Sequence, residues 1–489
     1  MRCGFTHRYA GLPERFHVAQ YPVAAPDPRC VVFNRPVAEL LGLDADALES
    51  NAAALFSGNA LPEDARPIAT AYAGHQFGHF VPRLGDGRAL LLGEIPCPDG
   101  VQRDLQFKGS GRTPFSRGGD GFAALGPMLR EYLISEAMHA LGIPTTRSLA
   151  VVSTGAAVQR DGPLPGAVLT RVAASHVRVG SFEYFGSRGD TEGLRLLLEH
   201  VVARHYPEAA EADNPALSVL DSVAERQARL IAQWMQVGFI HGVMNTDNMS
   251  IPGETIDYGP CAFMDGFDPR TVFSSIDHKG RYAYANQPVV AQWNLARLAE
   301  SLLPLIDPVP ETAVQKALQV IEPFIDRFDV QYLAGLRRKI GLHSEEGGDR
   351  DLIKALLDLM RDAQADHTLT FRELSDAAGD VASEPALRLR FATAPGFDDW
   401  MAAWHSRLAR DPQSARERSL GMRRVNPAFL PRNHRVEAAL DAASKEGDFL
   451  PFERLLRVVQ HPFDDQPGNS EYRKPPAPGE RVLQTFCGT

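Results

Sequence analysis

The sequence predicts an α+β protein with two lobes, a smaller one rich in strands and a larger one rich in helices. Between residue 66 and about residue 165, short apolar or alternating runs such as ALLLGEI (89–95) and DLQFKGS (104–110) lie between turn signals, which is typical of strands. Beyond residue 190 the apolar residues recur at helical spacing instead. Strands with a single long helix, followed by a mostly helical half, favour a two-lobed arrangement.

We predict an N-terminal extension over residues 1–65, where Pro-containing loops flank a short helical stretch, RPVAELLGLDADALES. The first lobe follows over residues 66–165. Its long helix is predicted at 126–142, because apolar side chains recur there with a period of 3.6 residues. Gly142 and Pro144 then form a stop signal for that helix.

The second lobe is predicted over residues 166–345, and a helical C-terminal extension with its tail over residues 346–489. The second lobe opens with a strand-like segment at 166–175 and is otherwise helical. Its expected helices cover 214–242, 289–306 and 311–328. In the extension, helical spacing continues from about residue 350 to 460, and the last thirty residues are rich in Pro and polar residues, which predicts an irregular strap.

The composition limits the classes of function. The chain has 489 residues and a formal net charge of −10, so a general attraction to nucleic acid is not expected. The first thirty residues contain no apolar core of signal-peptide length, and no run of eighteen apolar residues occurs. We therefore expect a cytoplasmic protein without a membrane span. No heptad pattern occurs, so a monomer is expected.

Five cysteines occur without CxxC spacing, which argues against a zinc site and against a disulfide-stapled secreted fold. Cys487 differs from the others because it lies in TFCGT, close to the end of the sequence, where a thiol is often exposed. An exposed thiol is a candidate for redox chemistry if its surroundings stabilise the thiolate.

A glycine-flanked turn is the first candidate for nucleotide binding. In LGDGRALLLGEI (84–95), Gly85 and Gly87 flank an Asp, and Arg88 leads into a strand. Because glycine has no Cβ, such a turn lets backbone N–H groups approach a phosphate closely. A plain hairpin turn is the competing interpretation. A second glycine-rich stretch, SRGGDGF (116–122), is equally ambiguous by itself.

Lys108 stands at the end of a predicted strand, and a helix carrying Glu131 and Glu136 follows some twenty residues later. Protein kinases use a strand Lys held by a helix Glu to position nucleotide phosphates. The two glutamates are separated by about 140° around the helix, so one of them is expected to face Lys108. We choose Glu131, which lies beside the apolar stripe. A surface salt bridge is the alternative.

Arg171 and Arg178 lie in the half-apolar segment LTRVAASHVRVG. Two Arg side chains can clamp a polyphosphate through bidentate hydrogen bonds. Ordinary surface Arg residues are the alternative, since the chain is rich in Arg.

The segment HGVMNTDNMS (241–250) is similar to a kinase catalytic loop but lacks one of its residues. Val243 occupies the position of the Asp that accepts the proton of the attacking hydroxyl in kinases. Asn248 and Asp257 are hard oxygen ligands that suit Mg²⁺ or Mn²⁺ bound to phosphates. Asp247 adjoins Asn248 and could accept a proton from an incoming hydroxyl. Taken singly, Asn and Asp in turns more often cap backbone groups.

His75 and His79 lie four residues apart in YAGHQFGHF, the spacing of a helical metal-ligand pair. Gly74 and Gly78 disfavour a helix there, and no HExxH glutamate accompanies the pair. We therefore expect these histidines to order a loop rather than to bind a metal.

Together these stretches resemble the selenoprotein O family of kinase-fold protein adenylyltransferases. The resemblance runs from about residue 70 to the C-terminus in long, nearly gapless segments. They are YAGHQFGHFVPRLGDGRALLLGE, DLQFKGSGRTPFSRGGDGFAAL, REYLISEAMHALGIPTTRSLAVV, HGVMNTDNMSIPGETIDYGPCAFMD, NPAFLPRNHRVEAAL and VQHPFDDQP. The resemblance implies a protein-kinase-like two-lobed fold that binds ATP inverted, with the α-phosphate facing the acceptor. Family members transfer AMP to Ser, Thr or Tyr hydroxyls of proteins and release pyrophosphate.

The resemblance also implies roles for particular residues of this chain. Asp247 matches the proton acceptor, Asn248 and Asp257 match ligands of Mg²⁺ or Mn²⁺, and Glu131 matches the partner of Lys108. Val243 is acceptable because an inverted nucleotide presents a different phosphorus to the acceptor. Contacts with ATP are implied for Gly85, Gly87, Arg88, Lys108, Asp120, Gly121, Arg171, Arg178 and Asp257.

Some family members carry a selenocysteine near the C-terminus, where this chain has Cys487. We hypothesise that Cys487 pairs with Cys261, just after IDYGP, and so tethers the tail over the active site. Three other functions stay open: uridylyl transfer from UTP, phosphoryl transfer from the γ-phosphate of ATP, and nucleotide binding in a scaffold without catalysis. The expected partners are protein substrates bearing Ser, Thr or Tyr.

Overall fold

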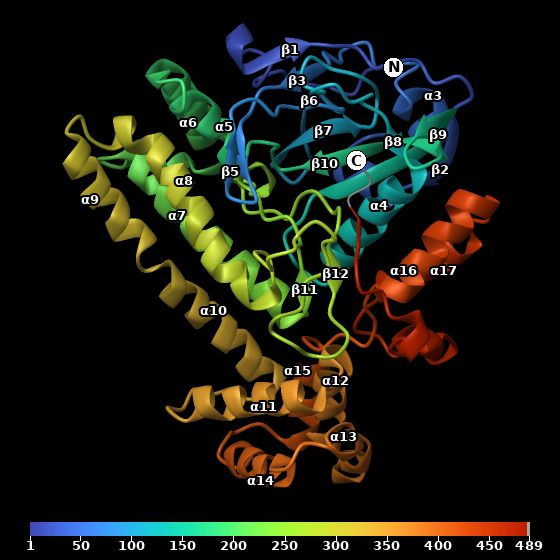
Figure 1. Ribbon diagram of the computed structural model, residues 1–489, viewed down its shortest axis with the longest axis vertical. Coiled ribbons are helices and arrows are strands. Elements are labelled where there is room, and N and C mark those ends of the chain that lie inside the picture. Colours follow the sequence, from blue (N-terminus) through green and yellow to red (C-terminus); the bar gives the residue numbers. More distant parts are fainter. Residues whose placement is uncertain (487–489) are drawn as a thin grey trace.

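The computed structural model describes residues 1–486, and its N-terminal part is built on an antiparallel sheet of eight strands (Figure 1). Seven strands follow the order β1-β3-β6-β7-β10-β9-β2, and β8 pairs with β10. The strands are β1 (His17–Ala19), β2 (Arg29–Phe33), β3 (Ile68–Thr70), β6 (Ala89–Pro96), β7 (Gln102–Lys108), β8 (Ala123–Ala124), β9 (Arg147–Gln159) and β10 (Pro163–Ala173).

The centre of the sheet contains the strands that the sequence predicted. β6, β7 and β10 cover the runs expected at 89–95, 104–110 and 166–175. β9 was missed, because its outer half is rich in small residues and exposed, so it lacks a clear alternation. The boundary between the lobes was expected at residue 165. The sheet continues past that residue, because β10 pairs with both β7 and β9.

The first 65 residues are integrated with the sheet. β1 pairs with β3 and β2 pairs with β9, so this segment supplies the strands at both ends of the sheet order. α1 and α3 pack against β9, and α3 also packs against β2, which helps to explain why the short strand β2 is stable there. The helices of this segment are α1 (Arg35–Leu40), α2 (Ala45–Ser50) and α3 (Ala52–Phe56).

The long helix α4 (Leu125–Ala140) packs against β9 and β10, close to the range predicted for it. Its apolar residues, Leu129 and Leu133 among them, are fully buried. Gly142 follows with φ of 75°, a left-handed conformation that ends the helix at low cost.

The middle of the chain is helical, as predicted. α7 packs against α8 and α10 through its apolar face. The single helix expected over 311–328 is instead two, α9 and α10, because Pro323 has no N–H to continue the first. The helices are α5 (Val179–Gly186), α6 (Thr191–His205), α7 (Pro215–Gln236), α8 (Gln287–Ile306), α9 (Pro310–Ile321) and α10 (Phe324–Lys339). Two further antiparallel pairs lie outside the large sheet: the hairpin of β4 (Gly74–Gln76) and β5 (His79–Val81), and the pair of β11 (Phe239–Ile240) and β12 (Ala262–Phe263).

The C-terminal extension forms two groups of helices (Figure 1). One group lies at the far end of α10 from the sheet, and the other, α16 and α17, packs against α4. The helices are α11 (Asp349–Ala363), α12 (His367–Ala377), α13 (Glu384–Arg390), α14 (Phe397–Leu408), α15 (Ala415–Arg423), α16 (Asn433–Asp441) and α17 (Leu450–Val459).

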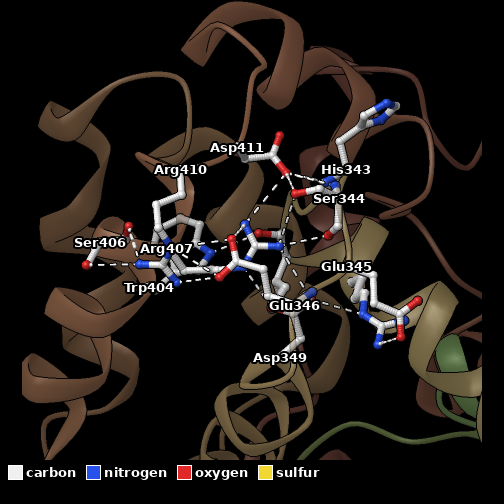
Figure 2. Close-up of polar contacts among 12 residues, drawn as sticks. His343, Ser344, Glu345, Glu346, Asp349, Trp404, Ser406, Arg407, Arg410 and Asp411 are labelled. Carbon is white, nitrogen blue, oxygen red and sulfur yellow. Dashed lines mark hydrogen bonds and ion pairs between the residues drawn. The ribbon is translucent and has the colours of Figure 1, made fainter.

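The acidic break after α10 is ordered by a polar network rather than left as a loose loop (Figure 2). The Asp411 carboxylate accepts the N–H groups of His343 at 2.8 Å and of Ser344 at 3.0 Å. Arg407 donates from Nε to Asp349 Oδ1 at 2.7 Å. These bonds join the start of α11 to the end of α14, which explains how a segment rich in like charges keeps one conformation.

The tail returns to the middle of the molecule. Thr485 donates its N–H to the Phe273 carbonyl at 2.7 Å and accepts from the Ser275 N–H at 3.0 Å. Its hydroxyl donates to the Pro260 carbonyl at 2.5 Å. Cys487 lies outside the described residues, so the predicted pairing with Cys261 stays a hypothesis. Over residues 1–486 we find no helix that combines the length and the apolar character needed to cross a membrane.

Candidate active site

All the residues predicted for the site line one cleft of about 630 Å³ between the sheet, α4 and the loop after β11. Sequence separation between them reaches more than 170 residues, so only the fold brings them together. They are Gly85, Gly87, Arg88, Lys108, Asp120, Gly121, Glu131, Arg171, Arg178, Asp247, Asn248 and Asp257.

Strand register places two of the cations side by side. Arg171 on β10 stands opposite Gln106 on β7. Gln106 is two residues before Lys108, and side chains two apart on a strand point to the same face, so Lys108 and Arg171 share one face of the sheet. α4 packs on that face and presents Glu131 to both of them. Lys108 Nζ donates to Glu131 Oε2 at 2.7 Å, and Arg171 Nε donates to Glu131 Oε1.

Glu136 occupies a different environment on the same helix. Its carboxylate accepts two hydrogen bonds from Arg147, at 2.8 and 2.7 Å. The contact between Lys108 and Glu131, rather than Glu136, agrees with the choice made from the apolar stripe of the helix.

Asp257 is the point at which the cations converge. Its Oδ1 accepts from Lys108 Nζ at 2.7 Å and from Arg171, and Arg178 Nη1 lies 3.6 Å from its Oδ2. Burial acts to raise the pKa of Asp257, but the charges of Arg171, Lys108 and Arg178 hold that pKa well below its usual value. The carboxylate is therefore ionised at neutral pH and ready to accept cations.

The two glycine-rich stretches form one wall of the cleft. Gly85 has φ of 66°, and a Cβ there would lie 2.3 Å from the Phe115 ring. A Cβ on Gly121 would lie 2.3 Å from the backbone of Gly111. Larger residues cannot fit at either position, so the wall is a backbone surface of the kind that approaches phosphates. Asp120 faces Arg160, at 2.8 Å, on the open side.

Asp247 lies at the junction of the cleft and the loop after β11. Its Oδ2 accepts from Gln76 Nε2 at 3.3 Å, and its buried Oδ1 has no hydrogen-bond partner among the described residues. Burial raises the pKa of Asp247 to about 6, although Arg178 acts in the opposite direction. An ionised carboxylate with one unsatisfied oxygen is able to accept a proton from a bound hydroxyl.

Asn248 and Asp257 both line the cleft and offer the hard oxygen atoms that a divalent cation shared with phosphates would need. The Asn248 amide donates from Nδ2 to the Val243 carbonyl at 2.9 Å, an arrangement that directs its oxygen away from this bond. No cluster of three or more His, Cys, Asp or Glu side chains with the geometry of a metal site occurs within residues 1–486. Two hard oxygen ligands suit an ion such as Mg²⁺, which keeps waters and substrate phosphates as its remaining ligands.

The β4–β5 hairpin supports the loop that carries Asp247, and its residues were underestimated from sequence. His75 N–H donates to Thr246 Oγ1 at 2.6 Å. His75 Nδ1 and Thr246 Oγ1 both bond to Glu183 on α5. The prediction that His75 orders a loop is therefore confirmed. The roles of Gln76 and Glu183 were missed, because no local pattern marks them.

Asp86, between the two glycines of the first turn, was noted in the sequence but given no role. Its Oδ2 accepts from the Thr70 N–H at 3.0 Å and from Thr70 Oγ1 at 2.6 Å. It thus holds the glycine turn against β3.

A cleft with a backbone wall, three clustered cations and a pair of hard oxygen ligands is typical of enzymes that bind and cleave nucleoside triphosphates. Comparison with known proteins gives the family. Residues 1–460 match the family described as protein adenylyltransferase SelO. The chain belongs to this family.

Curated relatives match along nearly their whole length. The chain is 60% identical over 485 residues to the protein nucleotidyltransferase YdiU of Rhizobium etli (strain CIAT 652), covering 99% of this chain and 97% of the relative. It is 57% identical over 485 residues to the protein of the same name from Rhizobium meliloti (strain 1021), covering 99% of both. It is 59% identical over 488 residues to that of Rhodopseudomonas palustris (strain BisB5).

Proposed function

We propose that the chain, a protein nucleotidyltransferase, transfers AMP from ATP to a Ser, Thr or Tyr hydroxyl of another protein. The acceptor oxygen attacks the α-phosphorus, the bond between that phosphorus and the bridging oxygen to the β-phosphate breaks, and pyrophosphate leaves. The observation that carries this proposal is the placement of Asp247 at the cleft, where Val243 replaces the kinase Asp. Family membership supports it.

The proposed fold is that of a protein kinase with the nucleotide inverted. Residues 66–165 and 166–345 form its two lobes in this proposal, flanked by the extensions at 1–65 and 346–489. The antiparallel sheet with α4, followed by a helical half, supports this assignment. An inverted nucleotide explains why the position of Val243 needs no carboxylate.

Lys108, Arg171 and Arg178 hold the departing pyrophosphate in this proposal. They already converge on the carboxylate of Asp257, and preorganised cations stabilise negative charge as it develops. Glu131 positions Lys108 and Arg171. Backbone groups at Gly85, Gly87 and Gly121, with Arg88 and Asp120, surround the rest of the nucleotide.

Asn248 and Asp257 would hold Mg²⁺ or Mn²⁺. Such an ion, when bound, neutralises phosphate charge and orients the leaving group. Asp247 accepts the proton of the attacking hydroxyl through its unpartnered Oδ1.

Uridylyl transfer from UTP is the second candidate, because the names of the relatives specify a nucleotide without saying which. The same phosphate contacts serve either nucleotide. Competition between labelled ATP and unlabelled UTP separates the two.

The decisive experiment supplies Mg²⁺ or Mn²⁺ and ATP labelled at the α- or the γ-phosphate, and counts label bound to acceptor protein. We expect label from the α-phosphate alone. Label from the γ-phosphate alone means an ordinary kinase, and no label with ATP still bound means a scaffold.

Asp257→Asn is the control for that experiment, and we expect transfer to fall by about 100-fold or more, since the charge that would bind the metal is lost. Asn is chosen because Asp257 has φ of 66°, which Asn tolerates better than Ala. Asp362→Asn, an exposed change of the same type on α11, should retain full transfer.

A further inference from the structure

A second cavity, of about 700 Å³, adjoins the nucleotide cleft. The two meet at Phe77 and Ile276, which line both, and Asp247 lines the nucleotide cleft on the other side of this boundary. One wall is the tip of the β4–β5 hairpin, and the other is the segment 276–281 with the start of α8. Gln76, which contacts Asp247, immediately precedes Phe77.

Phe77 is held in place at the junction of the two cavities. It has φ of 52°, and Gly78 after it has φ of 83°, so both central residues of the turn are left-handed. A bulky side chain rarely adopts this conformation. Its N–H is held by Asn245 Oδ1 at 3.0 Å and by the Tyr282 hydroxyl at 3.2 Å, which compensates for the strain.

The charge of this second cavity is opposite to that of the whole chain. Lys279 and His278 are exposed on one wall, and His79 on the other. Arg281 stacks over Trp293 at 4.7 Å. Neither Lys279 nor Arg281 makes an ion pair within the part of the chain that the structure describes, although the chain carries a net charge of −10.

The single acidic lining residue does not offset this charge. Asp277 is 6% exposed. Its Oδ1 accepts from the Arg281 N–H at 2.9 Å and its Oδ2 from the Tyr282 N–H at 2.7 Å. Its carboxylate is therefore committed to the backbone, and the surface that faces the cavity is basic, with Ile276 and Val289 as exposed apolar neighbours at 56% and 61%.

We propose that this basic cavity binds an acidic segment of the acceptor protein, a few residues away from the hydroxyl that receives the nucleotide. The inference rests on the proposed function and adds its substrate class: segments in which Asp or Glu lies near Ser, Thr or Tyr. The charge of Lys279 attracts the carboxylates, and ring N–H groups of His79 and His278 donate hydrogen bonds to them. Ile276 and Val289 contact apolar side chains of the same segment. Complementary charge between a basic surface and an acidic segment contributes to the choice of binding partner.

The test compares two sets of synthetic peptides that carry the same acceptor hydroxyls, one with Glu at flanking positions and one with Gln. Transfer from α-labelled ATP is measured as kcat/KM, and binding of fluorescent peptide without ATP is measured by anisotropy. For wild-type protein we expect the Glu peptides to be favoured roughly tenfold. Lys279→Glu should abolish this preference, mainly by raising KM for the Glu peptides. The same variant should show a higher kcat/KM than the wild type for peptides that carry Lys at the flanking positions.

Lys474→Glu is the matched control, since Lys474 is exposed on the tail and the change in net charge is identical. It should leave the preference intact, and ATP binding should be unchanged in both variants. Equal use of Glu and Gln peptides by the wild type, or a preference that survives in Lys279→Glu, overturns the inference.

Failure of the proposed function gives a different result. In that case no peptide receives α-label while ATP still binds. The anisotropy measurement then still decides the inference, because binding of Glu peptides must depend on Lys279. Tighter binding of single-stranded RNA than of Glu peptides, lost in Lys279→Glu, would assign the surface to a nucleic acid and also overturn it.

Discussion

At the scale of single residues, the cleft is a balanced cluster of buried charges. Lys108 and Arg171 each contact both Glu131 and Asp257, so neither cation depends on one partner. Buried charges that lose a partner are costly, whereas complete networks are stable. In the proposed function, the phosphates of ATP would take over contacts that Asp257 now makes, while Glu131 would keep both cations in position.

Glu131→Gln tests that role, with Glu136→Gln as a matched control on the same helix. Both replace a buried carboxylate that is bonded to Arg, so both should lower the melting temperature. Only Glu131→Gln should also lower kcat/KM for ATP, by roughly 10- to 100-fold, because a cation of the cleft loses its fixed position. A similar loss of activity in both variants would assign Glu131 to stability alone.

Glu254 gives a pH-dependent prediction away from the cations of the cleft. Burial raises its pKa from 4.5 to about 7, although the Ala174 N–H donates to it. Between those pH values the folded chain binds more protons than the unfolded chain, so the free energy of unfolding falls as pH rises through this window.

Glu254→Gln removes this ionisation. Ionisation of Glu254 should lower the free energy of unfolding of the wild type by up to about 3 kcal/mol between pH 5 and pH 8. The variant lacks this loss. Melting temperatures of both proteins at the two pH values measure the effect. The exposed change Glu208→Gln should not alter the pH dependence, and parallel curves for wild type and Glu254→Gln would contradict the prediction.

At the scale of elements, the β4–β5 hairpin connects the loop that carries Asp247 with the second cavity. Its backbone bonds to Thr246 and Asn245, and its tip separates the nucleotide cleft from the basic cavity. A hairpin that fixes the two residues before Asp247 is expected to affect the rate of transfer more than the binding of ATP.

Gly78→Ala tests the hairpin, because the residue has φ of 83° and Ala pays a steric cost there. Gly447→Ala is the matched control, at φ of 69° with no atom within 4 Å of a new Cβ. Both should lose roughly 1–2 kcal/mol of stability. Only Gly78→Ala should reduce kcat, and equal activity of the two variants would remove the hairpin from the mechanism.

At the scale of the whole molecule, segments distant in sequence complete the site. The N-terminal strands β1 and β2 complete the sheet, α16 and α17 pack against α4, and the tail returns to Pro260, next to Cys261. Thr485 therefore lies beside the segment that follows Asp257.

The hypothesis that Cys261 pairs with Cys487 is tested by peptide mapping of the oxidised protein. We expect one linked peptide that contains both cysteines, absent in Cys487→Ser. Transfer by the wild type should then differ between oxidising and reducing conditions, while transfer by Cys487→Ser should not. Identical activity of both proteins under both conditions would reject the coupling.

Local signals were sufficient for much of this protein. Helical periodicity predicted α4, α7 and α8, alternation predicted β6 and β7, and the spacing of Asn and Asp nominated Asn248 and Asp257. These signals come from residues close in sequence, which is why they can be recognised without a structure. Local signals did not reveal β9, because its pairing depends on β2 and β10. They also predicted one continuous helix where the structure has α9 and α10.

The sequence by itself determined the family, the two-part α+β architecture and the candidate residues of the cleft. The tertiary structure decided contacts that the sequence did not predict: Gln76 with Asp247, Gln106 with Arg171, and a basic cavity on a chain of net negative charge. The physical reason is distance along the chain. Contacts across 60 to 170 residues depend on how sheet, helix and loop pack, and no short pattern encodes that packing.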